Sequence, residues 1–280
     1  MSRPLRLDFP GAFHHVTARG NARDTVYRDN TDRTLFLGAL ERAVERFGWC
    51  VLAHCLMGNH YHLLVETPQA NLSRGMRHVN GVYAQRFNRR HARVGHVFQA
   101  RFHATLVDCD AHLLAAAAYV VLNPVRARLC QEPADWRWSS YRATVGLEPP
   151  GFLATDRLLG LLAESRPEAR RRYRAFVHAQ LPDNPFAQLD GSTILGDEAF
   201  VASHTAGLPL VPEIPRIQRH PLRPSLGELL AGDDLDAAVS FAYRRHGYTM
   251  AQMAAHLGVH YATVSRGIHR HEQRVSECKT

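Results

Sequence analysis

The stretch LMGNHYHLLVE (residues 56–66) decides how this chain of 280 residues is interpreted. Its two apolar runs, separated by Gly58-Asn59, are typical of two strands joined by a tight hairpin. His60 and His62 are two positions apart, so on a strand both side chains project from the same face. Two neutral imidazoles placed in this way could share one divalent metal ion if a neighbouring element supplied a third ligand. Chance is the alternative explanation, because the chain contains 18 histidines.

Strands and helices alternate around this hairpin. The hydrophobic patterns predict strands at residues 13–18, 49–57, 60–67 and 97–107, and helices at residues 31–47, 73–90 and 111–122. The order strand, helix, strand, strand, helix, strand, with one more helix after it, is that of a ferredoxin-like split βαβ plan. We therefore predict an α+β fold. It has a ferredoxin-like antiparallel sheet with helices on one face, followed by an all-α C-terminal region.

Composition shifts divide the chain into four expected segments. Residues 1–148 would form the domain that contains the sheet, and Pro149-Pro150-Gly151 marks its end. Residues 149–207 would be a helical extension, with a helix at 155–181. Residues 208–224 contain five prolines, which is typical of a linker. Residues 225–280 would form a separate helical module.

Charge and cysteine usage narrow the functional class. The chain carries 34 basic and 26 acidic residues, and residues 1–148 hold 19 of the basic and 12 of the acidic ones. Residues 241–280 are basic as well, with six basic and two acidic residues. Two basic regions suggest a polyanionic partner such as nucleic acid. The five cysteines lack CxxC spacing, and the sequence shows neither a secretory signal nor an apolar run of about 18 residues. These features favour a cytoplasmic protein without a membrane partner.

Tyr119 and Asn123 are the other candidates for chemistry. Tyr119 lies in an alanine-rich helix, where it is either a core residue or a hydroxyl left accessible by its small neighbours. A tyrosine hydroxyl is a weak nucleophile unless a metal ion or a cation stabilises the charge that develops on it. Asn123 follows one helical turn later, on the same face. From the residues alone, Asn123-Pro124 is better explained as the N-cap and first residue of a second helix.

Three motifs, in order, resemble one family. LMGNHYHLLVE (56–66) is similar to the HUH signature of single-tyrosine transposases. AYVVLNPVRARL (118–129), followed by WRWSSYR (136–142), looks like the tyrosine segment of that group. FHHVTARGNAR (13–23) resembles its first strand. The nearest subgroup is the REP-associated tyrosine transposases, which act on hairpin-forming palindromes in bacterial chromosomes. The resemblance spans about residues 10–142.

The resemblance implies a role for each matching position. His60 and His62 would bind a divalent metal ion, Mg²⁺ or Mn²⁺, with Asn123 as a third ligand, and Tyr119 would be the catalytic nucleophile. The segment Arg19-Gly20-Asn21 falls where the family contacts a short guide sequence beside the hairpin. The chain departs from the family pattern at three positions, where Gly58, Tyr61 and Arg128 replace a proline, a β-branched residue and a glycine. The family forms dimers, so a homodimer is an expectation that the sequence leaves open.

A second motif near the C-terminus has the pattern of a helix-turn-helix. In YTMAQMAAHLGVHYATVSRGIHRHE (248–272), Thr249 would cap a first helix, Gly258 would make the turn, and a basic second helix would start at His260. This arrangement would allow the module to bind duplex DNA. The residues expected to contact DNA are Tyr261, Thr263, Ser265, Arg266 and Arg270, the two arginines through phosphates or guanines. A plain helical hairpin is the alternative.

The leading hypothesis is an enzyme. The chain would cleave and rejoin single-stranded hairpin DNA through a 5′-phosphotyrosine intermediate, with the help of a divalent metal ion, in the cytoplasm and associated with the nucleoid. The alternative is a catalytically silent DNA-binding regulator that uses the helix-turn-helix. A metallohydrolase for small molecules ranks last, because the sequence nominates neither an activated water nor a general base.

Overall fold

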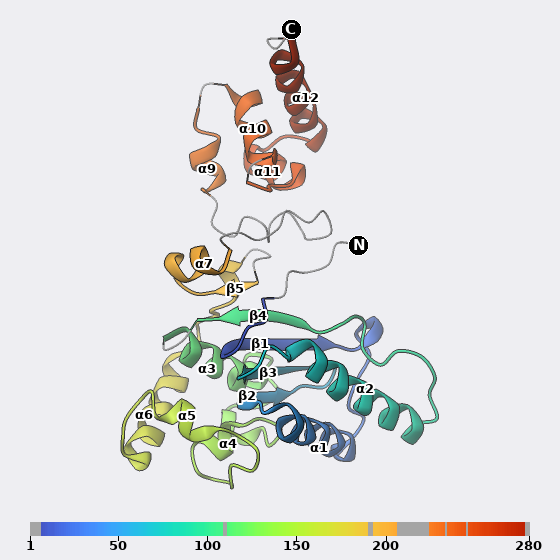
Figure 1. Cartoon of the computed structure of the whole chain (residues 1–280), viewed down its shortest axis with the longest axis vertical. Helices are drawn as coiled ribbons and strands as arrows, with labels where there is room; N and C mark the ends of the chain where they lie inside the picture. The colour runs from blue at the N-terminus through green and yellow to red at the C-terminus, as the bar shows by residue number, and fades with distance from the viewer. Residues whose placement is uncertain are drawn as a thin grey trace. The chain divides into compact units, whose positions relative to one another are not determined.

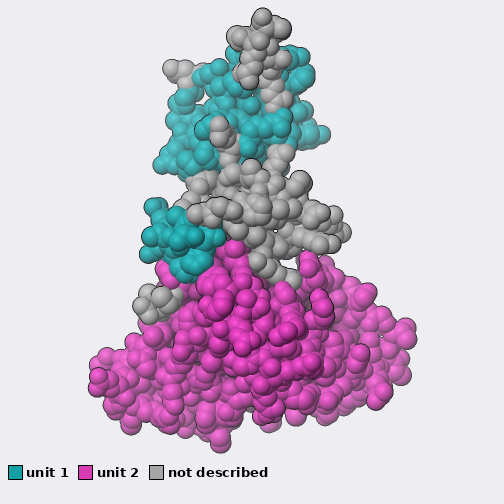
Figure 2. Space-filling model, in the orientation of Figure 1, with its two compact units in different colours: residues 1–5, 197–280 teal, residues 6–196 magenta. Residues whose placement is uncertain are grey.

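The computed structural model describes residues 7–108, 111–189, 193–205, 224–232, 234–244 and 246–277. It divides into two compact units, one comprising Arg6–Gly196 and the other containing Asp197–Thr280 (Figure 2). Most of the expected linker, residues 208–223, lies outside the described residues. Within the described residues, no helix is both long enough and apolar enough to cross a membrane.

The first unit is built on a five-stranded sheet with the order β2-β3-β1-β4-β5 (Figure 1). Its strands are β1 (Ala12–Arg19), β2 (Cys50–Leu56), β3 (His60–Thr67), β4 (His103–Val107) and β5 (Ile194–Leu195). The first four pair antiparallel in the order of the ferredoxin-like plan, which confirms the predicted fold class. The short β5, which the sequence patterns did not predict, pairs parallel with β4.

Two long helices cover one face of the sheet, as expected. They are α1 (Asn30–Phe47) and α2 (Leu72–Arg90). Helix α1 begins where the Asp29 carboxylate accepts a hydrogen bond from the Asp32 amide at 3.0 Å, and it ends at Gly48, whose φ of 68° is left-handed. Apolar side chains from both helices pack on Val16, Leu63 and Val65 of the sheet.

Helices also cover the second face of the sheet, which the expectation of helices on one face did not include. They are α3 (Ala111–Arg126), α4 (Tyr141–Thr144), α5 (Thr155–Leu159) and α6 (Arg166–Ala179). Leu158, Tyr173 and Val177 are buried in one core with the alanines of α3 and with Leu64 of β3. Residues 149–196 therefore belong to the same compact unit as the sheet, and the boundary expected after residue 148 is wrong.

Three predicted elements have different bounds in the structure. The strand expected at 97–107 is shorter, because residues 97–102 form a loop with only an isolated bridge, between Phe98 and Gly20, the residue that follows β1. The helix expected at 155–181 is divided into α5 and α6, with Pro167 in the first turn of α6, where its missing N–H costs nothing. Helix α3 does not end at residue 122 but continues through Pro124 to Arg126.

The second unit consists of α7 (Glu198–Thr205), α9 (Leu226–Leu229), α10 (Leu235–Arg244), α11 (Met250–Leu257) and α12 (Tyr261–Glu277). The Thr249 hydroxyl caps α11 and forms a capping box with Gln252, while Gly258 makes the turn with a φ of 66°. Met253, Val264 and Ile268 form its small core. The predicted pair of helices with a turn at Gly258 is thus present.

Gly75 offers a test of packing on the first face. A Cβ atom at Gly75 would lie 2.0 Å from the Trp49 ring, which is held by a 2.7 Å hydrogen bond from its indole N–H to Asn71 Oδ1. We expect Gly75→Ala to lower the free energy of unfolding by about 1–3 kcal/mol, as overpacking does. Gly81→Ala on the same helix, where a Cβ meets nothing within 4 Å, is the matched control and should be neutral or stabilising. Urea denaturation followed by circular dichroism makes the comparison, and equal effects at the two sites would contradict it.

Two buried histidines away from the cleft predict how stability depends on pH. Burial lowers the pKa of His14 and of His54 from 6.5 to about 4. Between these values the unfolded chain binds protons that the folded chain excludes. The contribution of the two neutral histidines to the free energy of unfolding is therefore complete above pH 6.5 and is lost as the pH falls toward 4. Each histidine contributes on the order of 3 kcal/mol to this loss. We expect the variant His14→Leu/His54→Leu to show a shallower fall in urea midpoint between pH 7 and pH 4.5; an unchanged fall would refute the assignment.

Candidate functional site

The site begins with the alternation of side chains on β3. His60 and His62 lie on the face that α3 covers, paired in register with Arg19 and Thr17 of β1. Their ring centroids are 5.1 Å apart. The prediction that the two imidazoles share one face is therefore confirmed by the register of the strands.

His62 is buried and has one ring nitrogen that is already engaged. Its Nδ1 lies 2.9 Å from Nε2 of His15, whereas its Nε2 is buried with no hydrogen-bond partner among the described residues. Burial, followed by the nearby His15, His60 and Arg19, holds the pKa of His62 well below its usual value. The ring is therefore neutral at pH 7. The tautomer with its proton on Nδ1 donates to His15 and keeps the Nε2 lone pair for a ligand.

His60 is oriented by the turn that precedes β3. Its Nδ1 lies 2.7 Å from Oδ1 of Asn59, an oxygen that can only accept, so Nδ1 donates and the lone pair of the neutral ring is on Nε2. Asn59 is itself fixed, because its Nδ2 donates to the Arg23 carbonyl at 3.1 Å. Burial and Arg19 lower the pKa of His60. Both rings can thus present an Nε2 lone pair to a metal ion.

Tyr119 reaches the same place from α3. Its half-buried ring meets the His62 ring edge-on, with centroids 5.8 Å apart. The Arg126 guanidinium carbon lies 4.9 Å from the centroid of the tyrosine ring. Burial raises the pKa of the phenol while Arg126 acts in the opposite direction. The hydroxyl is therefore protonated at neutral pH, and a cation lies beside it that would favour the phenolate.

Asn123 does not cap a helix, so the interpretation favoured by the residues alone is wrong. Helix α3 is continuous through this position, and the Asn123 Nδ2 donates to the Tyr119 carbonyl at 2.8 Å. Within the helix, the amide bonds back to the preceding turn, as polar side chains in helices do. This bond uses the amide nitrogen and leaves Oδ1 to accept or to ligate.

These residues line one cleft of about 490 Å³. Its walls include the four residues expected in a metal and nucleophile site, together with Arg19. The fit to a divalent ion rests on two neutral imidazoles, one of them with a buried and unpartnered Nε2, and on the amide oxygen of Asn123. In the described part of the chain, no group of three His, Cys, Asp or Glu side chains could hold a metal ion, so an ion at this site would need an amide or the substrate to complete its ligands.

Sequence reasoning missed three residues beside this cleft. His15 stacks on His62 with centroids 5.2 Å apart, and Phe186 stacks on His15 at 4.3 Å and meets Tyr119 edge-on at 4.9 Å. The third residue is Arg126, which links α3 to the segment after α6. It donates to the main-chain carbonyl of Tyr119 and to those of residues 180, 181 and 183. Alternation along β1 could have found His15, and the tyrosine motif contains Arg126. Phe186 comes from a distant segment that carries no signal.

The segment expected to contact a guide sequence lies at the edge of the cleft. Arg19 lines the cleft, and the Gly20 amide donates to the Asn59 carbonyl at 2.8 Å, which fixes the segment on the turn before His60. The Asn21 amide donates to the Val97 carbonyl at 2.9 Å. A Cβ at Gly20 would lie 2.0 Å from the Asp24 carbonyl oxygen, so the backbone there leaves no room for a side chain.

In the second unit, the predicted DNA-contacting residues do not all lie open. Tyr261, Thr263 and Arg266 are exposed on the first turns of α12, and Ser265 is half-buried. Arg270, in contrast, forms a bidentate ion pair with Asp236 of α10 at 2.7 and 2.8 Å. Its guanidinium is engaged in joining two helices. The side chain nevertheless remains exposed, so its contact with DNA stays a prediction.

Comparisons with known proteins agree with the motifs. Residues 11–123 match the family described as "Transposase IS200 like". A putative REP-associated tyrosine transposase of Haemophilus influenzae is 24% identical over 124 residues, which cover 40% of this chain and 70% of that protein. A solved structure described as a REP-associated tyrosine transposase bound to a REP hairpin is 19% identical and covers 55% of this chain and 92% of its own, with a TM-score of 0.46. The first two matches confirm the resemblance to the IS200-like transposases over the first half of the chain.

Proposed function

We propose that the first unit cleaves and rejoins single-stranded hairpin DNA through a covalent link to Tyr119, acting in the cytoplasm. The observation that carries the proposal is that one cleft brings together the Tyr119 ring, the two neutral histidines of β3 and the Asn123 amide. A basic chain with Arg19 and Arg101 on the walls of this cleft is suited to a phosphodiester. The homodimer expected from the resemblance stays a prediction, as does association with the nucleoid.

The chemistry needs a nucleophile and a means to neutralise phosphate charge. The Tyr119 oxygen would attack phosphorus, the bond from phosphorus to the 3′-oxygen would break, and the phenol proton would end on the released 3′-hydroxyl. The product is a 5′-phosphotyrosine, which another 3′-hydroxyl can attack to rejoin a strand. Arg126, stacked on the ring, favours the phenolate as the proton leaves.

The histidines and Asn123 would hold a Mg²⁺ or Mn²⁺ ion. When bound, such an ion polarises the phosphate and offsets the charge that builds on its oxygens. The contribution of His15 is to fix the His62 ring and its tautomer through the 2.9 Å bond between the two rings. Asn59 does the same for His60. The protein thus supplies ligands that are already deprotonated and oriented.

Removal of the Tyr119 hydroxyl tests the proposal. We expect Tyr119→Phe to abolish the covalent adduct with hairpin DNA in Mn²⁺ while changing binding by no more than about 1 kcal/mol, a hydrogen-bond-sized effect. Denaturing gels measure the adduct, and wild-type protein without metal should give none. Tyr27→Phe is the matched control, since the Tyr27 hydroxyl is buried without a hydrogen-bond partner among the described residues. Cleavage by Tyr119→Phe near the wild-type rate would overturn the assignment.

We propose duplex DNA binding by the second unit as a second function, which would suffice for a regulator. The observation in its favour is that the start of α12 presents Tyr261, Thr263 and Arg266 exposed after a helix-turn-helix turn.

Replacing one exposed arginine tests this second function. We expect Arg266→Ala in the full chain to weaken binding to duplex DNA and to reduce the salt dependence by about one unit of slope, as loss of one phosphate contact does. Arg244→Ala, an exposed arginine on α10, is the charge-matched control and should have the smaller effect. Fluorescence anisotropy at several salt concentrations gives both quantities. Equal losses in the two variants would show that only net charge matters.

A further inference from the structure

The catalytic cleft contains one more histidine, which the chemistry proposed above does not use. His103 begins β4, is exposed, and lines the cleft together with His60 and His62. Thr17 of β1 pairs with His62 on one side and with His103 on the other. Because directly paired residues project from the same face of a sheet, the imidazoles of His62 and His103 both lie on the face that α3 covers, with Thr17 between them.

His103 lies across the cleft from the histidine pair of β3. Two strand spacings separate His62 from His103, which places their backbones about 10 Å apart. Among the residues that the structure describes, no three side chains of His, Cys, Asp or Glu come together to hold one metal ion, so His103 is not a third ligand beside that pair. Tyr119 lies on the side of the pair, because its ring meets the rings of His62 and His15. A phosphate over Thr17 would thus have the nucleophile on one side and His103 on the other.

Strand transfer needs a proton donor on the side opposite the nucleophile. In an in-line displacement at phosphorus, the attacking oxygen and the leaving oxygen lie on opposite sides of the phosphate. The phenol proton of Tyr119 therefore cannot pass directly to the 3′-oxygen. An acid placed beside this oxygen would spare it from leaving as an alkoxide, which is a strong base.

His103 is the wall residue of the cleft whose chemistry suits this task. Imidazole gives and takes protons near neutral pH. The two histidines of β3 direct Nδ1 away from the cleft, since each Nδ1 is engaged by a neighbouring side chain. Arg19 and Arg101 also line the cleft, but a guanidinium does not give up its proton in proteins. The other described wall residues, apart from the nucleophile, carry amides, a hydroxyl or methyl groups, which do not titrate.

We propose that His103 is the catalytic proton shuttle for the 3′-oxygen. In cleavage, its imidazolium would give a proton to this oxygen as the bond from phosphorus breaks. The phenol proton of Tyr119 would pass to water, and water would recharge the ring, so the net transfer is from the phenol to the 3′-hydroxyl. Rejoining is the reverse: the neutral ring takes the proton of the incoming 3′-hydroxyl and passes it to water, from which the departing phenolate recovers one. This inference rests on the strand-transfer function proposed above.

A hairpin with sulfur in place of the bridging 3′-oxygen isolates this step. A thiol is a far stronger acid than an alcohol, so a thiolate leaves without being protonated. We expect His103→Ala to slow adduct formation with the ordinary hairpin in Mn²⁺ about 100-fold to 10,000-fold, as loss of a general acid does. The rate with the 3′-thio hairpin should stay near that of wild type. His103→Gln, whose amide forms hydrogen bonds but transfers no proton, should give the same pattern.

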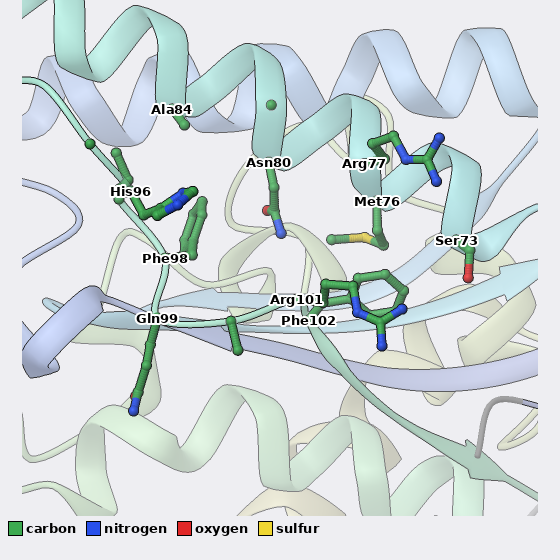
Figure 3. A pocket seen from close by; sticks show the side chains of 14 residues that line it. Ser73, Met76, Arg77, Asn80, Ala84, His96, Phe98, Gln99, Arg101 and Phe102 are labelled. Carbon is green, nitrogen blue, oxygen red and sulfur yellow. The ribbon is translucent and has the colours of Figure 1, made fainter. Parts of the chain in front are cut away.

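His96→Ala is the matched control. His96 is exposed on the loop that precedes β4, and it lines a different cavity, of about 630 Å³, between this loop and α2. Figure 3 shows the His96 ring facing α2, whereas the side chain of Gln99, on the same loop, points away from that helix. His96→Ala should leave the rates with both hairpins unchanged. Because both histidines are exposed, the melting temperatures of the variants should match that of wild type.

A binding measurement without metal separates this inference from the strand-transfer function. It uses hairpins whose 3′ flank ends at successive positions, either in a 3′-hydroxyl or in a 3′-deoxy sugar. At one position, the full chain should bind the 3′-hydroxyl end about threefold to tenfold more tightly, the effect of one hydrogen bond. His103→Ala should lose this preference, and His96→Ala should keep it.

The two measurements together decide the proposal. If His103→Ala slows the ordinary and the 3′-thio hairpins equally, or slows neither, His103 is not the acid. If wild type forms no adduct with either hairpin, the strand-transfer function fails. A 3′-hydroxyl preference that His103→Ala abolishes would then still place His103 at the 3′-oxygen, whereas the absence of any preference in wild type would overturn that placement as well. Weaker binding of His103→Ala to both kinds of end alike would identify a general effect on DNA binding and refute the specific role.

Discussion

Antiparallel pairing of β3 on both of its edges is the constraint on which the rest of the first unit depends. In this register Thr17 of β1 and Cys55 of β2 lie opposite His62. A shift by one residue would exchange the two faces, placing both histidines under α2 and Tyr61 under α3. Such a shift would place the imidazoles in the apolar core under α2, where polar groups without partners are costly. The alternation of His60, Tyr61 and His62 thus places the two histidines on the face covered by α3 and the tyrosine on the face covered by α2.

Local patterns predicted the parts of the molecule that local physics controls. The hairpin at Gly58-Asn59, the limits of α1 and the turn at Gly258 each depend on neighbouring residues, and their elements lie within a few residues of the expected bounds. The failures depend on distant partners. Asn123-Pro124 has the local signature of a cap, yet α3 continues because its alanines pack against the sheet. The ion pair of Arg270 could not be predicted either, because its partner Asp236 lies on another helix.

The candidate site shows the same division. His60 and His62 could be predicted to share a face, since strand periodicity is enough, while their protonation state depends on burial and on neighbours. The motif resemblance nominated Tyr119 and Asn123. The environment of the tyrosine could not be predicted, because Phe186 and the carbonyls bound by Arg126 come from residues 180–186, which the sequence placed in a separate extension.

Arg126 binds residues 180–183 in an unusual manner, since every hydrogen-bond acceptor that it has there is a main-chain oxygen. A carbonyl is present whatever the side chain, so the residues at positions 180, 181 and 183 are free to vary without loss of these bonds. Position 126, in contrast, requires arginine, because a lysine ammonium lacks the geometry to reach several separate acceptors at once. The same attachment can therefore persist among homologues whose sequences after α6 no longer align. Comparison of their sequences alone would give no sign of it.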